Sequence, residues 1–345
     1  MDNRIKLVKE LSEINCIAGF EEDLFNYIKE ACREFANVKL DNIGNIFIES
    51  KKLNKKNGVL LEAHGDEVGF IVKSITNNGM LRFINIGGIR KNTYCGSNVI
   101  IKNTEGKCIR GTIVSIHSSG KMKIDQKMSN AEFVIDIGAN SYYDAINHFH
   151  IDIGLSVVPE TRFSYDEENK ICWGKAFDNR LGCAALLLTC LTLEKMQLSY
   201  QALISAQEEV GMRGIRYAMK SIEAKAAICF EGMLSKDSYI DYEIGQTALK
   251  HGPIIRYTDR SMISNQVILK QVFDIARQKN IPIQRVVKNS GETNASTIYY
   301  NFGIPTVVMG IPVRHIHTFT SIASSLDLEY SVRLATEFVK LINEK

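Results

Sequence analysis

Four short apolar runs in this chain are each followed, within a few residues, by histidine, aspartate or glutamate. The runs cover residues 58–61, 202–206, 226–230 and 305–309. An apolar run of this length, bounded by glycine and polar residues, indicates a strand buried on both faces, as in a parallel sheet. Amphipathic segments of helical period lie between the runs. The sequence therefore predicts an α/β fold with a mixed, largely parallel sheet flanked by helices.

The polar residues that follow these strands predict a single site. The carboxyl ends of parallel strands share one edge of a sheet, where ligands bind in open α/β folds. An aspartate at the start of the helix predicted over residues 178–196 joins the set. We expect seven side chains to meet there: His64, Asp66, Asp178, Glu208, Glu209, Glu231 and His317.

A cluster of this composition is typical of a hydrolytic metal centre. Carboxylates that lie together repel one another and lose hydration, so a cation or a proton must compensate. Histidine and carboxylate ligands without cysteine suit Zn²⁺, Co²⁺ or Mn²⁺, and about three protein ligands suffice for one ion, so the set is large enough for two. Taken alone, each motif has a simpler interpretation: Glu208 and Glu209 as solvated loop residues, and Asp178 as a helix N-cap.

The length of 345 residues exceeds the ~250–300 at which single cores stop growing, which predicts a domain with an insertion. Residues 71–164 contain short alternating runs separated by glycines, with little helical periodicity. This pattern predicts a small β-barrel or sandwich inserted into the α/β domain. The expected division is a discontinuous catalytic domain of residues 1–70 and 165–345, with residues 71–164 as the β-rich insertion.

Charge and composition exclude several classes of function. The net charge is only +3 and the lysines are scattered, so no nucleic-acid partner is expected. No apolar stretch approaches the ~18 residues of a membrane span, and the polar first residues do not resemble a secretion signal. Eight cysteines occur without a Cys-x-x-Cys pair, several in apolar runs, as expected for reduced thiols in a core. We therefore expect a cytoplasmic protein.

Four segments of the chain, taken together, resemble one known family. They are His64-Gly65-Asp66-Glu67-Val68-Gly69, Ala176-Phe177-Asp178-Asn179-Arg180, Glu208-Glu209-Val210-Gly211-Met212-Arg213-Gly214 and Arg314-His315-Ile316-His317-Thr318. Their order and spacing are similar to those of the tetrahedral, or glutamyl, aminopeptidases, which are dinuclear metallo-aminopeptidases and include members labelled endoglucanases. The resemblance spans nearly the whole chain. It implies a zinc-exopeptidase-like sheet, a PDZ-like insertion used for self-association, peptide substrates, and dimers that assemble into a dodecamer.

The resemblance also implies that five side chains hold two divalent metal ions per subunit, Zn²⁺ or Co²⁺ with Mn²⁺ as an alternative. His64 and Glu231 would bind one ion, and Glu209 and His317 would bind the other. Asp178 would bridge the two.

Two further roles follow from the resemblance. Asp66 would orient the imidazole of His64 without binding the metal itself. Glu208 would be the general base that takes a proton from the water bridging the two ions and passes it to the leaving amine. The residue after the bridging aspartate, here Asn179, is often joined to it by a cis peptide in such enzymes.

The chain departs from the family pattern at three places near the site. Glu231 stands where the family usually has aspartate, and Asn294 stands where it has the aspartate of a Gly-Thr-Asp-Ala segment. The glutamate usually found shortly after the last histidine is absent from residues 318–322. The last two departures fall near the expected substrate end of the site.

The leading hypothesis is an aminopeptidase that releases N-terminal residues from peptides. A dinuclear-metal amidohydrolase that removes an acyl group from a small amine would use the same chemistry and is the main alternative. A non-catalytic assembly member of the family is a third hypothesis. A glycosidase needs two carboxyl groups about 5–9.5 Å apart and no metal, which would leave the histidines without a role.

Overall fold

Four parallel strands form the centre of a mixed sheet in the computed structural model, which describes residues 2–51, 58–116, 130–238 and 247–344. The strands lie in the order β12 (Tyr200–Ser205), β3 (Val59–His64), β13 (Ala226–Leu234) and β16 (Thr306–Arg314). All three neighbouring pairs are parallel. The four apolar runs of the sequence are therefore adjacent strands, and their carboxyl ends point the same way.

Antiparallel strands extend the sheet on both sides. The hairpin of β1 (Ala36–Leu40) and β2 (Ile46–Ser50) pairs with β12. On the other side the order continues through β17 (Ser321–Ser324), β11 (Ile171–Gly174) and β10 (Ser164–Asp166). Strand β14 (Ile254–Thr258) pairs antiparallel with β16 and parallel with β15 (Gln284–Val287). The predicted mixed sheet is confirmed.

Helices cover both faces of the sheet. Apolar residues of five helices pack into the largest core on one face: α1 (Asn3–Glu13), α2 (Glu22–Ala31), α4 (Phe177–Met196), α6 (Gln266–Gln278) and α8 (Ser325–Asn343). The short helices α5 (Arg213–Ala218) and α7 (Asn294–Phe302) pack into a smaller core on the other face. No helix within the described ranges is long and apolar enough to cross a membrane.

The prediction for the last central strand was wrong at its end. The sequence predicts this strand over residues 305–309 and a loop from residue 310 onward. Instead β16 continues to Arg314, since pairing with β13 persists as far as Val313. The edge strands β17, β11 and β10 and the helix α7 were not predicted.

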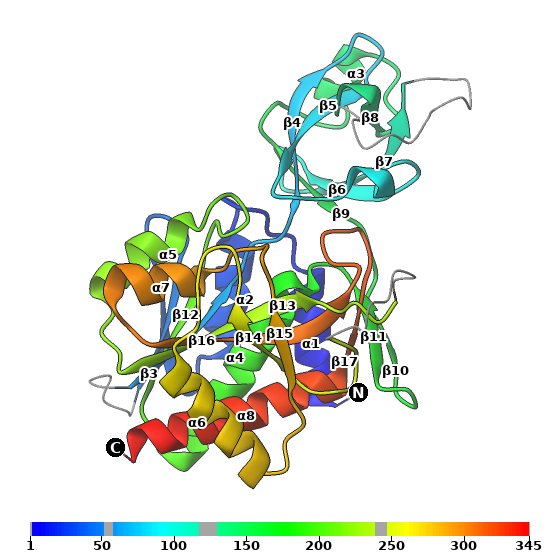
Figure 1. Ribbon diagram of the computed structural model, residues 1–345. Coiled ribbons are helices and arrows are strands. Elements are labelled where there is room, and N and C mark those ends of the chain that lie inside the picture. The colour runs from blue at the N-terminus through cyan, green and yellow to red at the C-terminus, as the bar shows by residue number, and fades with distance from the viewer. Residues whose placement is uncertain (1, 52–57, 117–129, 239–246, 345) are drawn as a thin grey trace.

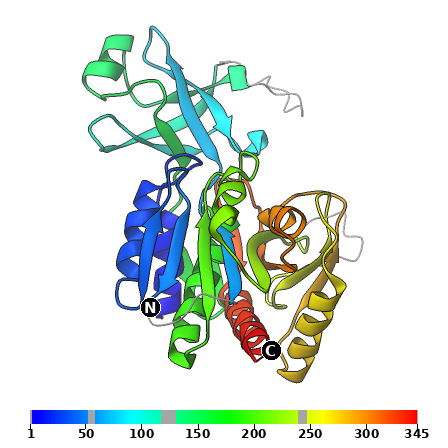
Figure 2. The ribbon, with the colours of Figure 1, turned by 90° about the vertical axis from the view of Figure 1, so that its left-hand side faces the viewer.

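A second body, a closed barrel of six strands, lies beyond the carboxyl end of the central strands (Figures 1 and 2). It confirms the expected β-rich insertion, and its short helix α3 (Tyr142–Asn147) was not predicted. A separate core fills it, in which the rings of Phe70, Phe83 and Phe133 surround Tyr94. The strands close in the order β4 (Gly69–Ile75), β5 (Leu81–Ile86), β8 (Phe133–Asp136), β7 (Cys108–Ser115), β6 (Asn98–Lys102) and β9 (Ser156–Pro159).

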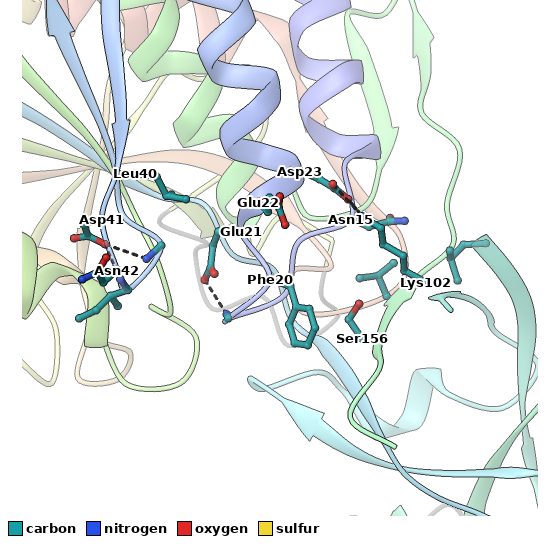
Figure 3. A pocket seen from close by; sticks show the side chains of 15 residues that line it. Asn15, Phe20, Glu21, Glu22, Asp23, Leu40, Asp41, Asn42, Lys102 and Ser156 are labelled. Atoms are coloured by element: carbon teal, nitrogen blue, oxygen red, sulfur yellow. Dashed lines mark hydrogen bonds and ion pairs between the residues drawn. The ribbon is translucent and has the colours of Figure 1, made fainter. Parts of the chain in front are cut away.

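A cavity of about 330 Å³ lies where the barrel meets the α/β body (Figure 3). Strands β6 and β9 line one side, and Phe20 and the start of α2 line the other. Lys102 of the barrel forms an ion pair with Asp23 at 2.8 Å, and the buried carboxylate of Glu21 accepts the backbone N–H of Gly19. This cavity contains none of the seven predicted site residues.

Candidate metal centre

The topology brings all seven predicted residues to one edge of the sheet. Strand β3 ends at His64, which leads directly to Asp66, and Glu208 and Glu209 follow the end of β12. Glu231 lies inside β13 rather than at its end, so the prediction that this strand finishes at residue 230 was wrong. The remaining two lie at the start of α4 and in the loop after β16: Asp178 and His317.

Two groups of donor atoms share one aspartate. In the first group, Nε2 of His64 lies 3.3 Å from Oδ1 of Asp178 and 3.1 Å from Oε1 of Glu231. In the second, Nε2 of His317 lies 3.2 Å from Oδ2 of Asp178 and 3.4 Å from Oε1 of Glu209. The donor atoms within each group all lie within 4.8 Å of one another. Each oxygen of Asp178 therefore faces a different imidazole.

The backbone around Asp178 is shaped to present its carboxylate. Asp178 and Asn179 are joined by a cis peptide and have non-helical dihedral angles, so the regular helix begins only after them. The amide of Asn179 donates to the carbonyl of Phe230 in β13 at 2.8 Å. Gly232 permits this close approach, because a Cβ there would lie 2.6 Å from the Cα of Asp178.

Arg180 ties this segment to the loop that carries His64. Its guanidinium is fully buried and donates to the carbonyl of Gly65 at 2.8 Å and to that of Leu11, at the end of α1, at 2.6 Å. Beside it, Lys175 and Glu67 form a buried ion pair at 2.6 Å. A buried guanidinium needs several acceptors, and the backbone carbonyls of Gly65 and of the end of α1 supply them. The two segments that carry His64 and Asp178 are thus held by one side chain.

Asp66 contacts different partners from those expected. Its carboxylate lies 3.7 Å from Nδ1 of His64, whereas its backbone carbonyl oxygen lies 3.1 Å from that atom. The carboxylate instead accepts the backbone N–H groups of Glu208 at 2.9 Å and Glu209 at 3.1 Å. Asp66 therefore links the segment after β3 to the two glutamates, a connection that the sequence did not reveal.

Burial dominates the electrostatics of the glutamates. It raises the pKa of Glu208 well above its ordinary value, that of Glu209 to about 7 and that of Glu231 to about 8. Burial also opposes ionisation of the histidines, but neighbouring carboxylates outweigh it. Glu231 and Glu208 raise the pKa of His64 well above its usual range, and Glu209 and Asp178 raise that of His317 to about 9.

The donor set fits divalent cations. Burial would raise the pKa of Asp178, but hydrogen bonds from His317 and His64 hold it below its ordinary value. The buried Oε1 of Glu209 has no hydrogen-bond partner, although an imidazole nitrogen lies 3.4 Å away. Buried, unsatisfied carboxylate oxygens are costly unless a cation compensates. The groups that could hold one ion are therefore His64, Asp178 and Glu231, and for another they are Asp178, Glu209 and His317.

A cavity of about 420 Å³ is lined by these groups and also by cationic side chains. Arg256 forms a buried ion pair with Asp259 at 2.6 Å, but its Nε is buried without a hydrogen-bond partner. Lys288 is half-buried, and burial together with Arg256 lowers its pKa. Neither residue was predicted from the sequence, because both come from segments that carry no motif.

Asn294 does not face this cavity, contrary to the expectation that it lies near the substrate. Its amide is buried and donates to Oε1 of Glu62 and to the hydroxyl of Ser205, both at 2.8 Å. Glu62 is a fully buried carboxyl in β3 that also accepts from the thiol of Cys229. The acidic member of this hydrogen-bonded pair is thus Glu62 on β3, whereas the family pattern has an acidic residue at position 294.

Known proteins resemble the chain over almost its whole length. A putative aminopeptidase of Acetivibrio thermocellus is 28% identical over 98% of this chain and 99% of its own length. The TET aminopeptidase of Thaumarchaeota archaeon SCGC AB-539-E09 superposes with a TM-score of 0.90, at 30% identity over 99% of this chain and 100% of that chain. The TET1 peptidase of Pyrococcus horikoshii, which can assemble into a tetrahedron or a large octahedral shell, has a TM-score of 0.85 at 26% identity over 97% and 99%.

The match to a family agrees with the site. Residues 44–334 match the family described as M42 glutamyl aminopeptidase, and this span includes all seven predicted site residues. The resemblance seen in four motifs is confirmed, and the fold, the acidic and imidazole groups and the relatives all point to the same chemistry. The chain belongs to the M42 glutamyl aminopeptidase family and is a peptide hydrolase.

Proposed function

We propose that the protein is an aminopeptidase that uses two divalent metal ions, Zn²⁺ or Co²⁺ with Mn²⁺ as an alternative. The observation that carries this proposal is the placement of Asp178, whose two oxygens each face one of two separate imidazoles at 3.2–3.3 Å. His64 and Glu231 would complete one ion site, and Glu209 and His317 the other. The unsatisfied buried oxygen of Glu209 supports the same assignment.

The bound ions would lower the pKa of a water molecule and polarise the scissile carbonyl. Glu208 is the proposed general base. Its carboxylate lines the cavity, 4.0 Å from Nε2 of His64, and belongs to neither group of donor atoms. The positive charge of the bound ions would lower the pKa that burial raises and so favour the ionised form of Glu208. The ionised carboxylate can take a proton from the attacking water and pass it to the leaving amine. Asp66 would hold the backbone of Glu208 in place.

We further propose that the enzyme favours peptides with an acidic N-terminal residue. Lys288 forms no ion pair with another described residue, and Arg256, which also lines the cavity, has a buried Nε without a hydrogen-bond partner. A carboxylate entering there would gain charge-assisted hydrogen bonds. The glutamyl description of the family agrees with this preference.

A second candidate reaction is the removal of an acyl group from a small N-acyl substrate. Residues 318–321, which follow His317, contain no carboxylate that could bind a substrate amine. The cations of the cavity wall could instead bind the carboxylate of an N-acyl amino acid.

We also propose that residues 71–164 join subunits into dimers that assemble into a dodecamer, while residues 1–70 and 165–345 form the catalytic domain. The assemblies of the P. horikoshii relative support this. A cytoplasmic location is proposed because all eight cysteines are free and six of them are buried. Light scattering on the purified protein would measure the subunit number.

The central test compares the wild type with Glu208→Gln on free and N-acetylated peptides, with added Zn²⁺, Co²⁺ or Mn²⁺. Because glutamine keeps the shape but cannot take a proton, turnover should fall by about 10²–10⁴-fold while the metal content stays unchanged. Unchanged turnover would exclude Glu208 as the base. Cleavage of only the acetylated peptides would favour the deacylase, and a wild type that cleaves neither set would favour a non-catalytic assembly protein.

A further inference from the structure

The loop between β16 and β17 reaches up from the α/β body to the base of the barrel (Figure 1). Phe319 lies in this loop, two residues after His317. Its side chain packs in the core of the barrel, where only 7% of its surface is exposed. Its ring centroid lies 6.3 Å from that of Phe70 and 6.4 Å from that of Tyr94. An aromatic ring from one domain thus forms part of the other domain's core.

The backbone at His315 and His317 has an uncommon conformation. His315 has φ 60° and His317 has φ 58°, in the left-handed region that non-glycine residues rarely occupy. Such a conformation persists only where the surroundings enforce it. The hydroxyl of Thr318 donates to the carbonyl of His315 at 2.6 Å, which closes the loop locally.

Further contacts that enforce this conformation come from residues 71–164. The backbone N–H of Arg90 donates to the carbonyl of His317 at 2.9 Å, and the hydroxyl of Thr161 donates to the carbonyl of Phe319 at 2.6 Å. A Cβ on Gly88 would lie 3.3 Å from Nδ1 of His317, so this turn packs closely against the imidazole. The neighbouring Gly87 lies equally close to the side chain of Glu209.

The second donor group therefore has contacts with the barrel in addition to its contacts within the α/β body. The segments that carry His64 and Asp178 are tied together by Arg180 within the α/β body. The two residues that belong only to the second group, Glu209 and His317, contact the turn that follows β5 of the barrel. Loosening the barrel contact would then affect one group more than the other.

We propose that Phe319 is a positioning residue for the second metal ion: with its ring anchored in the barrel core, it fixes the imidazole of His317 toward Asp178 and Glu209. The inference rests on the two-ion site of the proposed function. It predicts that the α/β body alone does not determine the metal content, because the inserted domain holds one ligand of the second ion in place.

The test measures metal binding by the full chain, independently of activity. Apo-protein is titrated with Zn²⁺ by calorimetry, and the bound metal is counted by elemental analysis after dialysis at fixed free Zn²⁺. Phe319→Ala should keep one ion at the wild-type affinity and bind the other about 10–100-fold more weakly, the usual effect of removing a group that orients a metal ligand. Phe319→Leu keeps an apolar side chain in the barrel core and should recover most of the affinity for the second ion that Phe319→Ala loses.

Phe133→Ala provides the matched control. Phe133 is another buried phenylalanine of the barrel core and packs against Tyr94 at 5.3 Å, but it belongs to β8 and not to the loop that carries His317. The Phe133→Ala protein should bind both ions with wild-type affinity. Thermal unfolding of each variant establishes that it is folded, and if either alanine variant does not fold, Phe319→Val is compared with Phe133→Val in the same way.

Two results would overturn the inference while leaving the proposed function intact. One is a folded Phe319→Ala protein that binds both ions with wild-type affinity. The other is an equal loss of the second ion in Phe133→Ala, which would mean that any softening of the barrel has this effect. A wild type that binds fewer than two ions would instead refute the two-ion site itself, and this inference with it.

Discussion

Asp66→Asn separates the role observed for this residue from the one that its family position implies. The carboxylate of Asp66 is fully buried and accepts one backbone N–H with each oxygen, at 2.9 Å from Glu208 and 3.1 Å from Glu209. Asparagine keeps one acceptor and turns an amide toward the other N–H. The substitution should therefore displace the backbone of Glu208 and leave the imidazole of His64, which contacts the carbonyl of residue 66, where it is.

The magnitude follows from these contacts. One charge-assisted hydrogen bond becomes neutral and one buried donor is left unsatisfied, which together cost about 2–4 kcal/mol of unfolding free energy. With an unfolding entropy of about 2.1 cal/mol/K per residue over 345 residues, the midpoint of cooperative thermal unfolding should fall by about 3–6 °C. Displacement of the base should lower kcat by about 10–100-fold, while the affinity of the His64 group for metal is retained.

The assay combines thermal unfolding, metal titration and steady-state kinetics at saturating metal. Asp327→Asn is the control, because Asp327 is equally buried and accepts two backbone N–H groups, those of Lys250 and Gly252, both at 2.7 Å, at the start of α8 outside the cavity. It should keep the wild-type kcat. An Asp66→Asn enzyme with wild-type kcat and an unchanged midpoint would refute the role of Asp66 in holding the backbone of Glu208. A selective loss of metal from the His64 group would favour the orienting role instead.

Three other changes test separate features. Lys288→Met should lower kcat/KM for peptides with N-terminal glutamate by about 10–100-fold, as expected for the loss of a charged hydrogen bond, and leave peptides with N-terminal leucine unaffected; an equal loss on both peptides would argue against a carboxylate subsite. His317→Ala should bind one ion in place of two by elemental analysis, and two retained ions would remove His317 from the ligand set. Burial raises the pKa of Asp327 from 3.8 to about 7. Between pH 3.8 and pH 7 the carboxyl group is therefore protonated in the native chain and ionised in the unfolded chain. The stability that this proton contributes is full below pH 3.8 and is lost as the pH rises through 7. Urea unfolding should therefore show wild-type stability falling relative to that of Asp327→Asn by about 1.4 kcal/mol per pH unit within this window, and parallel pH profiles for the two proteins would contradict it.

The centre of the sheet was predictable because burial on both faces leaves a plain signal. Strands β3 and β12 read as continuous apolar runs, and the polar residues after them had to share an edge once the strands were parallel. The prediction ended β16 too early. The apolar run stops at Met309, before Gly310 and Pro312, whereas pairing with β13 continues to Val313. Register over many residues is a tertiary effect and leaves no local mark in the sequence.

The parts of the site that could not be predicted depend on contacts between distant segments. Nothing near Asp66 indicates that its carboxylate would bond the backbone of residues 208 and 209 rather than an imidazole two residues away. Lys288 and Arg256 become part of the site only because β14 and β15 bring them to the cavity wall. Phe319 reads as an ordinary loop residue, and only the position of the barrel shows where its ring is buried.

The closure of the barrel limits how subunits can associate through it. Each of its six strands has a neighbour on both sides in the described part of this domain, although β5 and β8 pair at one position only, Leu81 with Ile135. Closure leaves few free edge positions in the described part of the barrel at which another chain could add a strand. Contacts between copies at the described strands would then be made mainly by side chains, so substitution of surface residues should tune or abolish them without disturbing the fold beneath.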